Sequence, residues 1–359
     1  MPLDFASHNC SGITAGAYEG LRIYLGVPPE PPPAVFSKKA STVIPDEAIL
    51  RRYDVDARPL LPGSPDGRPD KNTADGGVVD EWGVTWSKHG QSHFYATDGP
   101  FHHLEEPALQ DLETYSWPNP ADSGRFRGLR ERARKLHQET DYAVVLSFNV
   151  GPMTIGQWIR GFSQWLSDLL INPLFSEGMT ERITDFWIKF AEKALQEAGE
   201  YVDITMFGDD LGVQQGPIMK PDLYRRMLKP WHKKIVEALK QQGQPVLFHC
   251  CGSIVPFIPD LIEVGIDALN PVQVAAAGMD TLRLKKAFGR DISFWGAIDS
   301  QSVLARGTPE DVRKEVKQRI EDLARDGGYV LCATHNLQPE VKAENIEAMY
   351  AAGVDYGKY

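Results

Sequence analysis

The rest of this 359-residue chain is organised around the stretch Val246-Leu-Phe-His-Cys-Cys-Gly252. Its apolar beginning indicates a short buried strand, and its end carries a histidine and two cysteines. Because side chains alternate along a strand, His249 and Cys251 point to one face while Cys250 points to the opposite one. A His and a Cys on the same face supply half of the ligands that a zinc site needs.

A second stretch of the same character lies far downstream, at Gly328-Tyr-Val-Leu-Cys-Ala-Thr-His-Asn336. It predicts another buried strand, which contains Cys332 and runs towards His335. A buried cysteine is most often a small apolar core residue, so core packing is the alternative for each thiol. Cysteines and histidines gathered at two strand ends favour a metal site, which only the fold can assemble from such distant segments.

Short apolar strands alternate with helices over most of the chain. We expect strands at 2–5, 57–61, 143–149, 204–210, 245–249, 268–273, 292–299 and 329–332. We expect helices at 15–25, 47–53, 122–137, 156–170, 176–198, 221–242, 255–264, 281–288, 308–324 and 342–352. This alternation predicts a parallel sheet, and eight such units predict an α/β fold of the (β/α)₈ TIM barrel type.

Residues 62–138 differ in composition from the rest of the chain, because Gly, Pro, Asp and aromatic residues dominate there. We expect one domain over residues 1–359, with 62–138 as a loop-rich aromatic insertion that contains a β-hairpin. Barrel enzymes place such excursions at the C-terminal mouth, where they build the substrate pocket. Trp82 is therefore a candidate substrate-binding residue, and the alternative is that Trp82 and Trp86 form the core of the hairpin.

Composition narrows the function classes. The net charge is −11 and no basic run occurs, so we expect neither a nucleic acid nor an anionic membrane surface as a partner. No apolar stretch is long enough to cross a bilayer, and the first residues lack the pattern of a signal peptide. The few cysteines suggest available thiols in a reducing cytoplasm rather than a disulfide framework. A homodimer is one assembly that the sequence leaves open.

Polar side chains gather where the predicted strands end, and in TIM barrels those ends form the active site. Besides the residues already named, the predicted rim includes the segment from His8 to Cys10. The candidate catalytic residues are Asp209 and His335. Of the two adjacent carboxylates Asp209 and Asp210, only one can face the mouth, and helix or turn capping is the alternative role. The candidate substrate-binding residues are Asn149, Asn270, Gln273 and Asp299, in addition to Trp82.

The metal set predicted from these residues is His249, Cys251 and Cys332. Three protein ligands leave one position open, which is typical of catalytic rather than structural zinc. Two thiolates and one neutral imidazole form a soft set that suits a thiol or an ether oxygen as fourth ligand. His335 and Cys10 are further candidates for the ligand set.

Several of these motifs together resemble the uroporphyrinogen decarboxylase superfamily. The resemblance spans about residues 5–352 and is carried by the segments 249–252, 256–265, 269–273, 294–299 and 334–338. It implies a distorted (β/α)₈ barrel and one of two activities. One is metal-free decarboxylation of a tetrapyrrole, and the other is zinc-dependent methyl transfer to or from a corrinoid protein.

Two features favour the methyltransferase branch. The decarboxylases carry an arginine-rich stretch near the first strand, whereas residues 4–12 contain no arginine. The methyltransferases carry His-x-Cys and a distant Cys as zinc ligands, and the resemblance assigns these roles to His249, Cys251 and Cys332. The chain differs from its relatives in starting at the first strand. It also lacks a cobalamin-binding motif, so the resemblance implies that cobalamin arrives on a separate corrinoid protein.

We therefore expect a zinc-dependent enzyme that moves a methyl group from a small O-methyl compound, such as an aryl methyl ether, to a corrinoid protein. Three alternatives remain open. The methyl group could pass from a methylcobamide to a thiol, or the enzyme could decarboxylate a porphyrinogen-like acid. A non-enzymatic module that docks a corrinoid protein would instead hold a structural zinc closed by a fourth protein ligand such as His335.

Overall fold

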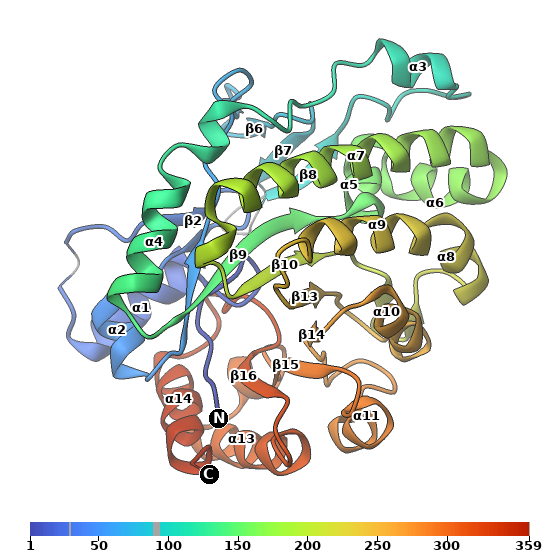
Figure 1. The fold of residues 1–359 in the computed structure, drawn as a ribbon. Helices are drawn as coiled ribbons and strands as arrows, with labels where there is room; N and C mark the ends of the chain where they lie inside the picture. The colour runs from blue at the N-terminus through green and yellow to red at the C-terminus, as the bar shows by residue number, and fades with distance from the viewer. Residues whose placement is uncertain (29, 89–93, 359) are drawn as a thin grey trace.

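A computed structural model describes residues 1–28, 30–88 and 94–358, and shows a curled parallel sheet wrapped by helices (Figure 1). Seven strands form this sheet, and neighbours in space follow one another in the chain. Their order across the sheet is β4 (Ala57–Leu60), β9 (Ala143–Val150), β10 (Ile204–Gly208), β13 (Val246–His249), β14 (Ala268–Asn270), β15 (Ser293–Ile298) and β16 (Tyr329–Ala333). All pairs are parallel, so every carboxyl end meets the same rim.

The expected first strand is reduced to one parallel bridge between Leu3 and Leu331 of β16. The amide of Asp4 donates to the carbonyl of Leu331 over 3.0 Å, and the amide of Asp56 donates to the carbonyl of Leu3 over 2.9 Å. The N-terminal segment thus lies between β16 and the start of β4, at the two edges of the sheet. The prediction of an eight-unit barrel is confirmed as a distorted (β/α)₈ fold whose eighth strand is rudimentary.

Most of the helices pack around the outside of the sheet (Figure 1). The helices are α1 (Ala15–Leu25), α2 (Glu47–Arg52), α3 (Leu109–Thr114), α4 (Leu129–Glu139), α5 (Pro152–Arg160), α6 (Phe162–Ile171), α7 (Pro173–Ala198), α8 (Pro221–Met227), α9 (Lys229–Leu239), α10 (Ile258–Val264), α11 (Thr281–Phe288), α12 (Val303–Arg306), α13 (Pro309–Leu323) and α14 (Ala343–Tyr356). Over the part of the chain that the structure describes, no helix combines the length and the apolar character that a membrane crossing requires.

Two expected helices are each divided in two. The helix expected at 156–170 is interrupted at Gly161, whose φ of +94° is incompatible with a right-handed helix. The helix expected at 221–242 is interrupted at Leu228, and Pro230 lies in the first turn of the second part. Proline cannot donate to the preceding turn and its ring clashes with that turn, so it ends one helix and suits the start of the next.

The insertion contains more β-structure than one hairpin. β5 (Lys71–Asn72), β6 (Val78–Val79), β7 (Thr85–Lys88) and β8 (Phe94–Asp98) form an antiparallel sheet. Trp86 packs in the core, and its Nε1 donates to Asp80 Oδ2 over 2.8 Å. The helix expected from residue 122 begins only at Leu129, after a short 3₁₀ turn. That residues 1–359 form one domain with 62–138 as its insertion remains our proposal.

The floor of the barrel repeats one hydrogen-bonding device. In each case the aspartate lies just before a strand, and its carboxylate accepts the backbone N–H of a residue on the neighbouring strand over 2.7 Å. The backbone N–H of the aspartate donates to the carbonyl of that same residue. The three pairs are Asp56 with Leu3, Asp203 with Val144 and Asp267 with Val246. These carboxylates satisfy strand amides that have no partner below them, so they stabilise the end of the barrel opposite the rim.

Replacing Asp203 by alanine tests this device. The buried amide of Val144 would lose its acceptor, which should lower the free energy of unfolding by about 1–3 kcal/mol. Urea denaturation followed by circular dichroism measures the loss, and the exposed Asp141→Ala is the matched control. Equal stability of the two variants would show that the carboxylate does not support the strand.

Candidate metal centre

His249 ends strand β13 at the rim and is buried. Its Nδ1 lies 2.5 Å from Asn270 Oδ1, and the Asn270 amide group donates to the carbonyl of Trp295 over 3.2 Å. Because the amide of Asn270 is oriented by Trp295, its oxygen accepts the proton of Nδ1. The Nε2 lone pair of His249 is therefore left free for a metal. Asn270 is fully buried behind this ring, so the structure gives it a positioning contact instead of the predicted substrate contact.

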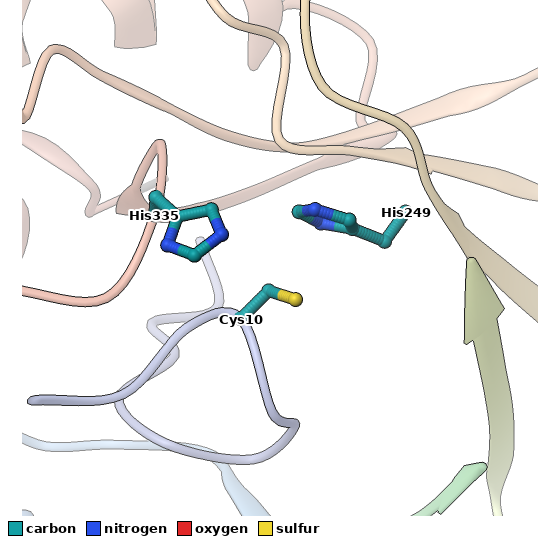
Figure 2. A group of neighbouring side chains, drawn as sticks. All are labelled: Cys10, His249 and His335. Atoms are coloured by element: carbon teal, nitrogen blue, oxygen red, sulfur yellow. The ribbon is translucent and has the colours of Figure 1, made fainter. Parts of the chain in front are cut away.

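Cys10, His249 and His335 form one group of potential metal ligands (Figure 2). One donor atom from each lies within 4.8 Å of the other two. Cys10 comes from the loop after the N-terminal bridge, and His335 from the loop after β16. The rings of His249 and His335 are 5.6 Å apart between centroids and inclined at 71°. The fold thus brings together three distant segments at one point of the rim.

Cys251, His249 and Asp210 form a second group with the same 4.8 Å limit. Cys251 Sγ lies 3.3 Å from His249 Nε2, on the side of the ring opposite its bond to Asn270. The amide of Cys251 donates to Asp210 Oδ1 over 2.9 Å, which holds the cysteine loop against the end of β10. His249 belongs to both groups and is the centre of the site.

The electrostatics of the site match a place for a cation. Burial lowers the pKa of His249, but the charges of Cys10 and Cys251 and hydrogen bonds to them raise it well above its ordinary value. Burial raises the pKa of Cys10, but the charge of His249 and hydrogen bonds with neighbouring histidines bring it well below its ordinary value. A negative thiolate beside an imidazole is the arrangement that a soft divalent metal stabilises in place of a proton.

The donors fit zinc, because sulfur and imidazole nitrogen are its preferred ligands and the group is shielded from water. Cys332, however, lies outside both groups. It is fully buried within β16 among Met206, Trp295 and other apolar residues of the barrel interior. Since β16 continues to Ala333, Cys332 sits below the rim whereas His335 lies beyond it. A ligand role for Cys332 remains a prediction that the geometry does not support.

Asp209, the predicted catalytic carboxylate, lies outside both donor groups, whereas Asp210 belongs to one of them. Asp209 is fully buried and accepts from the amides of Met153 and Thr154 over 2.8 and 2.7 Å, at the start of α5. His232 Nε2 lies 2.9 Å from Asp209 Oδ2, the same oxygen that accepts from Met153. Asp209 therefore caps a helix, and Asp210 is the carboxylate beside the metal ligands. Strand β10 ends at Gly208, so alternation no longer determined which aspartate faces the mouth.

The remaining predicted residues surround the site more loosely. Gln273 accepts from the amide of Gly252 over 2.8 Å and so supports the cysteine loop. Asp299 accepts from the amide of Gln301 and caps the turn after β15. Cys250 packs in the apolar core, as its strand position predicted. The side chain of Asn149 lies outside the described residues.

Two cavities flank the centre. One has about 540 Å³ and is lined by His335, Arg306, Ser300 and other polar residues. The other has about 260 Å³ and is lined by Trp82, Asn9 and an aromatic cluster. Trp82 lines this second cavity and stays a candidate substrate-binding residue. Sequence analysis missed Trp187 in this wall, where adjacent aromatic residues on an amphipathic helix were the available signal.

Comparison with known proteins gives relatives with two activities. The profile of the family described as Uroporphyrinogen decarboxylase (URO-D) matches residues 90–356. Methylcobamide:CoM methyltransferase MtbA from Methanosarcina mazei is 22% identical over 214 residues, which are 59% of either chain. A uroporphyrinogen decarboxylase from Geobacillus sp. is 21% identical over 277 residues, 68% of this chain and 74% of that one. The chain spans about three fifths of the length of the methyltransferase that it matches.

The fold has a close counterpart among solved structures. A methyltransferase from Methanosarcina mazei superimposes with a TM-score of 0.68 at 18% identity, covering 98% of this chain and 94% of that one. At this identity the likeness concerns the fold, and it agrees with the curled sheet and its rim.

Zinc binding separates the two possible ligand sets. We expect the Cys10→Ser variant to bind zinc more weakly than the wild type, by more than the roughly 10- to 100-fold that the loss of an outer partner of a ligand costs. We expect the Cys332→Ala variant to retain wild-type affinity, because Cys332 lies outside both donor groups. Competition with a chromophoric chelator, together with elemental analysis, measures both. Loss of zinc in the Cys332 variant but not in the Cys10 variant would restore the set predicted from sequence.

Proposed function

The chain belongs to the uroporphyrinogen decarboxylase family, and on this basis we propose that it is a zinc-dependent methyltransferase. It takes a methyl group from a small O-methyl compound and passes it to the cobalamin of a separate corrinoid protein. The observation that carries this proposal is the presence of two groups of sulfur, nitrogen and carboxylate donors that share His249 at the rim, one with Cys10 and His335 and one with Cys251 and Asp210. Sulfur and nitrogen donors of this kind have no part in a metal-free decarboxylation.

The proposed methyl transfer is a nucleophilic displacement at the methyl carbon. The O–CH₃ bond of the ether breaks, and cob(I)alamin contributes the electron pair of the new cobalt–carbon bond. The oxygen keeps the electrons of the broken bond and takes up a proton as the alcohol or phenol leaves. Bound zinc would supply a Lewis acid that withdraws charge from the ether oxygen.

The residues of this chain prepare the site for that step. Asn270 fixes the imidazole of His249, and Asp210 fixes the loop that carries Cys251. Cys10 and His249 are buried, so electrostatic interactions at the centre are not weakened by bulk water. The protein's contribution is therefore orientation of the two reactants and stabilisation of the leaving oxygen.

Transfer in the opposite direction, from a methylcobamide to a thiol, is the second candidate. It is favoured by the likeness to a methylcobamide:CoM methyltransferase and by the polar cavity beside His335, in which Arg306 offers a cation for an anionic thiol. Decarboxylation is disfavoured, because residues 4–12 contain no arginine that could hold propionate groups. The corrinoid partner and a cytoplasmic location belong to the same proposal.

A docking module with structural zinc is the non-enzymatic rival, since four protein donors can close a zinc site. Substitution with Co²⁺ distinguishes the two cases. In a catalytic site the visible absorption bands of cobalt change when a thiol or an aryl ether is added, because the ligand shell has an exchangeable position. In a closed structural site the bands stay the same.

Methyl transfer itself is the direct test. We expect the zinc-loaded protein to convert cob(I)alamin to methylcobalamin with at least one member of a panel of methoxybenzenes, methoxyphenols and methoxybenzoates. The Cys251→Ala variant should be inactive because it removes a donor at the centre, whereas the exposed Asp141→Ala variant should match the wild type. If zinc is bound and no ether of the panel alkylates cobalamin, the O-methyl version is wrong and thiol acceptors become the next substrates.

A further inference from the structure

The segment that follows β10, residues 209–212, lies against the stretch that carries two of the donor side chains. The backbone N–H of Asp209 donates to the carbonyl of His249 over 2.9 Å. Asp210 Oδ1 accepts the backbone N–H of Cys251, also over 2.9 Å. The position of these two aspartates therefore determines where His249 and Cys251 lie.

A glycine at each end of this contact lets the two segments approach closely. A Cβ atom added to Gly208 would lie 2.8 Å from the Cβ atom of His249. One added to Gly212 would lie 2.7 Å from the carbonyl oxygen of Cys251. Both distances are shorter than non-bonded atoms tolerate, so the two segments are packed without slack and shift together.

The side chain of Asp209, a fully buried carboxylate, anchors this segment from behind. Its Oδ1 accepts from the amide and the hydroxyl of Thr154 over 2.7 and 2.8 Å, and its Oδ2 accepts from the amide of Met153 over 2.8 Å. The fourth donor is His232 of α9, whose Nε2 lies 2.9 Å from Oδ2. Burying a carboxylate is costly unless its oxygens are hydrogen-bonded, so these four donors hold it in one place.

His232 itself is held in one orientation. Its side chain is buried, and its ring meets those of Phe207 and Phe248 edge to face, with centroids 6.0 and 5.6 Å away. Since a carboxylate can only accept, the proton lies on Nε2. Nδ1 then accepts from the hydroxyl of Tyr224, 3.2 Å away. Burial raises the pKa of Tyr224 well above its ordinary value, which keeps this hydroxyl protonated.

The hydroxyl of Thr154 connects the two aspartates. It donates to Asp209 Oδ1 and accepts the backbone N–H of Asp210 over 3.2 Å. Asp210 in turn belongs to the donor group that contains His249 and Cys251. A continuous series of hydrogen bonds thus runs from α9 to the metal centre.

We propose that His232 is a positioning residue for the metal centre. By donating to Asp209, it holds Asp210 and the loop that carries Cys251 in the arrangement in which their donors can share one ion. This inference rests on the proposed function, to which it adds a residue that lies outside both donor groups.

Amide hydrogen exchange in the metal-free, full-length protein tests the proposal independently of zinc. The His232→Phe variant keeps an aromatic ring but loses the donor, whereas the side-chain amide of His232→Gln can donate in place of Nε2. The measured quantity is the exchange rate at Cys251 relative to that in β16, which reports global stability. We expect this ratio to rise by about 10-fold in His232→Phe and to return towards the wild-type value in His232→Gln.

Val236→Ala is the matched control, because Val236 is buried one turn further along α9 and its truncation removes packing without removing a hydrogen bond. It should lower the thermal midpoint and leave the ratio unchanged. Thr154→Val, which removes only the hydroxyl between the two aspartates, should raise the ratio as well. It provides the same test if His232→Phe does not fold.

Zinc affinity of the same variants, measured by competition with a chromophoric chelator, is the second readout. We expect His232→Phe to bind zinc more weakly, by roughly the 10- to 100-fold that the loss of an outer partner of a ligand costs. Val236→Ala should bind zinc as the wild type does.

Three outcomes would overturn the proposal: an unchanged ratio in both His232→Phe and Thr154→Val, equal acceleration at Cys251 and in β16, or wild-type zinc affinity in His232→Phe. Failure of the proposed function is a separate result. If the ratio rises as expected but the wild type binds no zinc or transfers no methyl group to cobalamin, the positioning of the loop stands and the proposed function fails. If methyl transfer occurs while the ratio stays unchanged in both variants, the function stands and this assignment fails.

Discussion

The hydrogen bond between His249 Nδ1 and Asn270 Oδ1 is the contact on which the site depends. It decides which nitrogen of the ring carries the proton, and so turns Nε2 towards Cys10, Cys251 and His335. The contact works because Asn270 is itself oriented by the carbonyl of Trp295 on the next strand. The orientation of this imidazole therefore depends on three adjacent strands, β13, β14 and β15, and the register between them holds the three residues in place.

Trp295 also ties the N-terminal segment to this frame. Its indole Nε1 donates to the buried carboxylate of Asp4 over 2.8 Å, while its carbonyl receives the amide of Asn270. Asp4 in turn pairs with Leu331 where the two edges of the sheet meet. The loop that follows Asp4 carries Asn9 to the aromatic cavity and Cys10 to His249. Barrel closure and assembly of the candidate metal centre are thus consequences of the same few contacts.

The sequence predicted the barrel and its reactive rim. Apolar strands alternating with helices indicate the barrel, and the His, Cys and Asn residues at the strand ends indicate which rim carries the site. The sequence also predicted Cys251 beside His249, but it did not predict which further thiol lies there. Cys332 and Cys10 both belong to rim segments, and the choice depends on where β16 ends and on how the N-terminal loop folds back, which are tertiary properties. The same limit applied to Asp209 and Asp210, since alternation loses its meaning once a strand has ended. The aromatic cavity draws on the insertion, α7 and two strand ends, so no local pattern could reveal it.

The central claim is that nitrogen and sulfur donors from three distant loops bind one zinc ion. X-ray absorption at the zinc edge of the reconstituted protein tests this most directly, because it reports the ligands themselves. The account predicts a mixed shell, with sulfur at about 2.3 Å and imidazole nitrogen at about 2.0–2.1 Å. A shell of oxygen atoms alone, or no zinc bound under reducing conditions, would contradict it and would leave the rim without the metal on which the proposed methyl transfer depends.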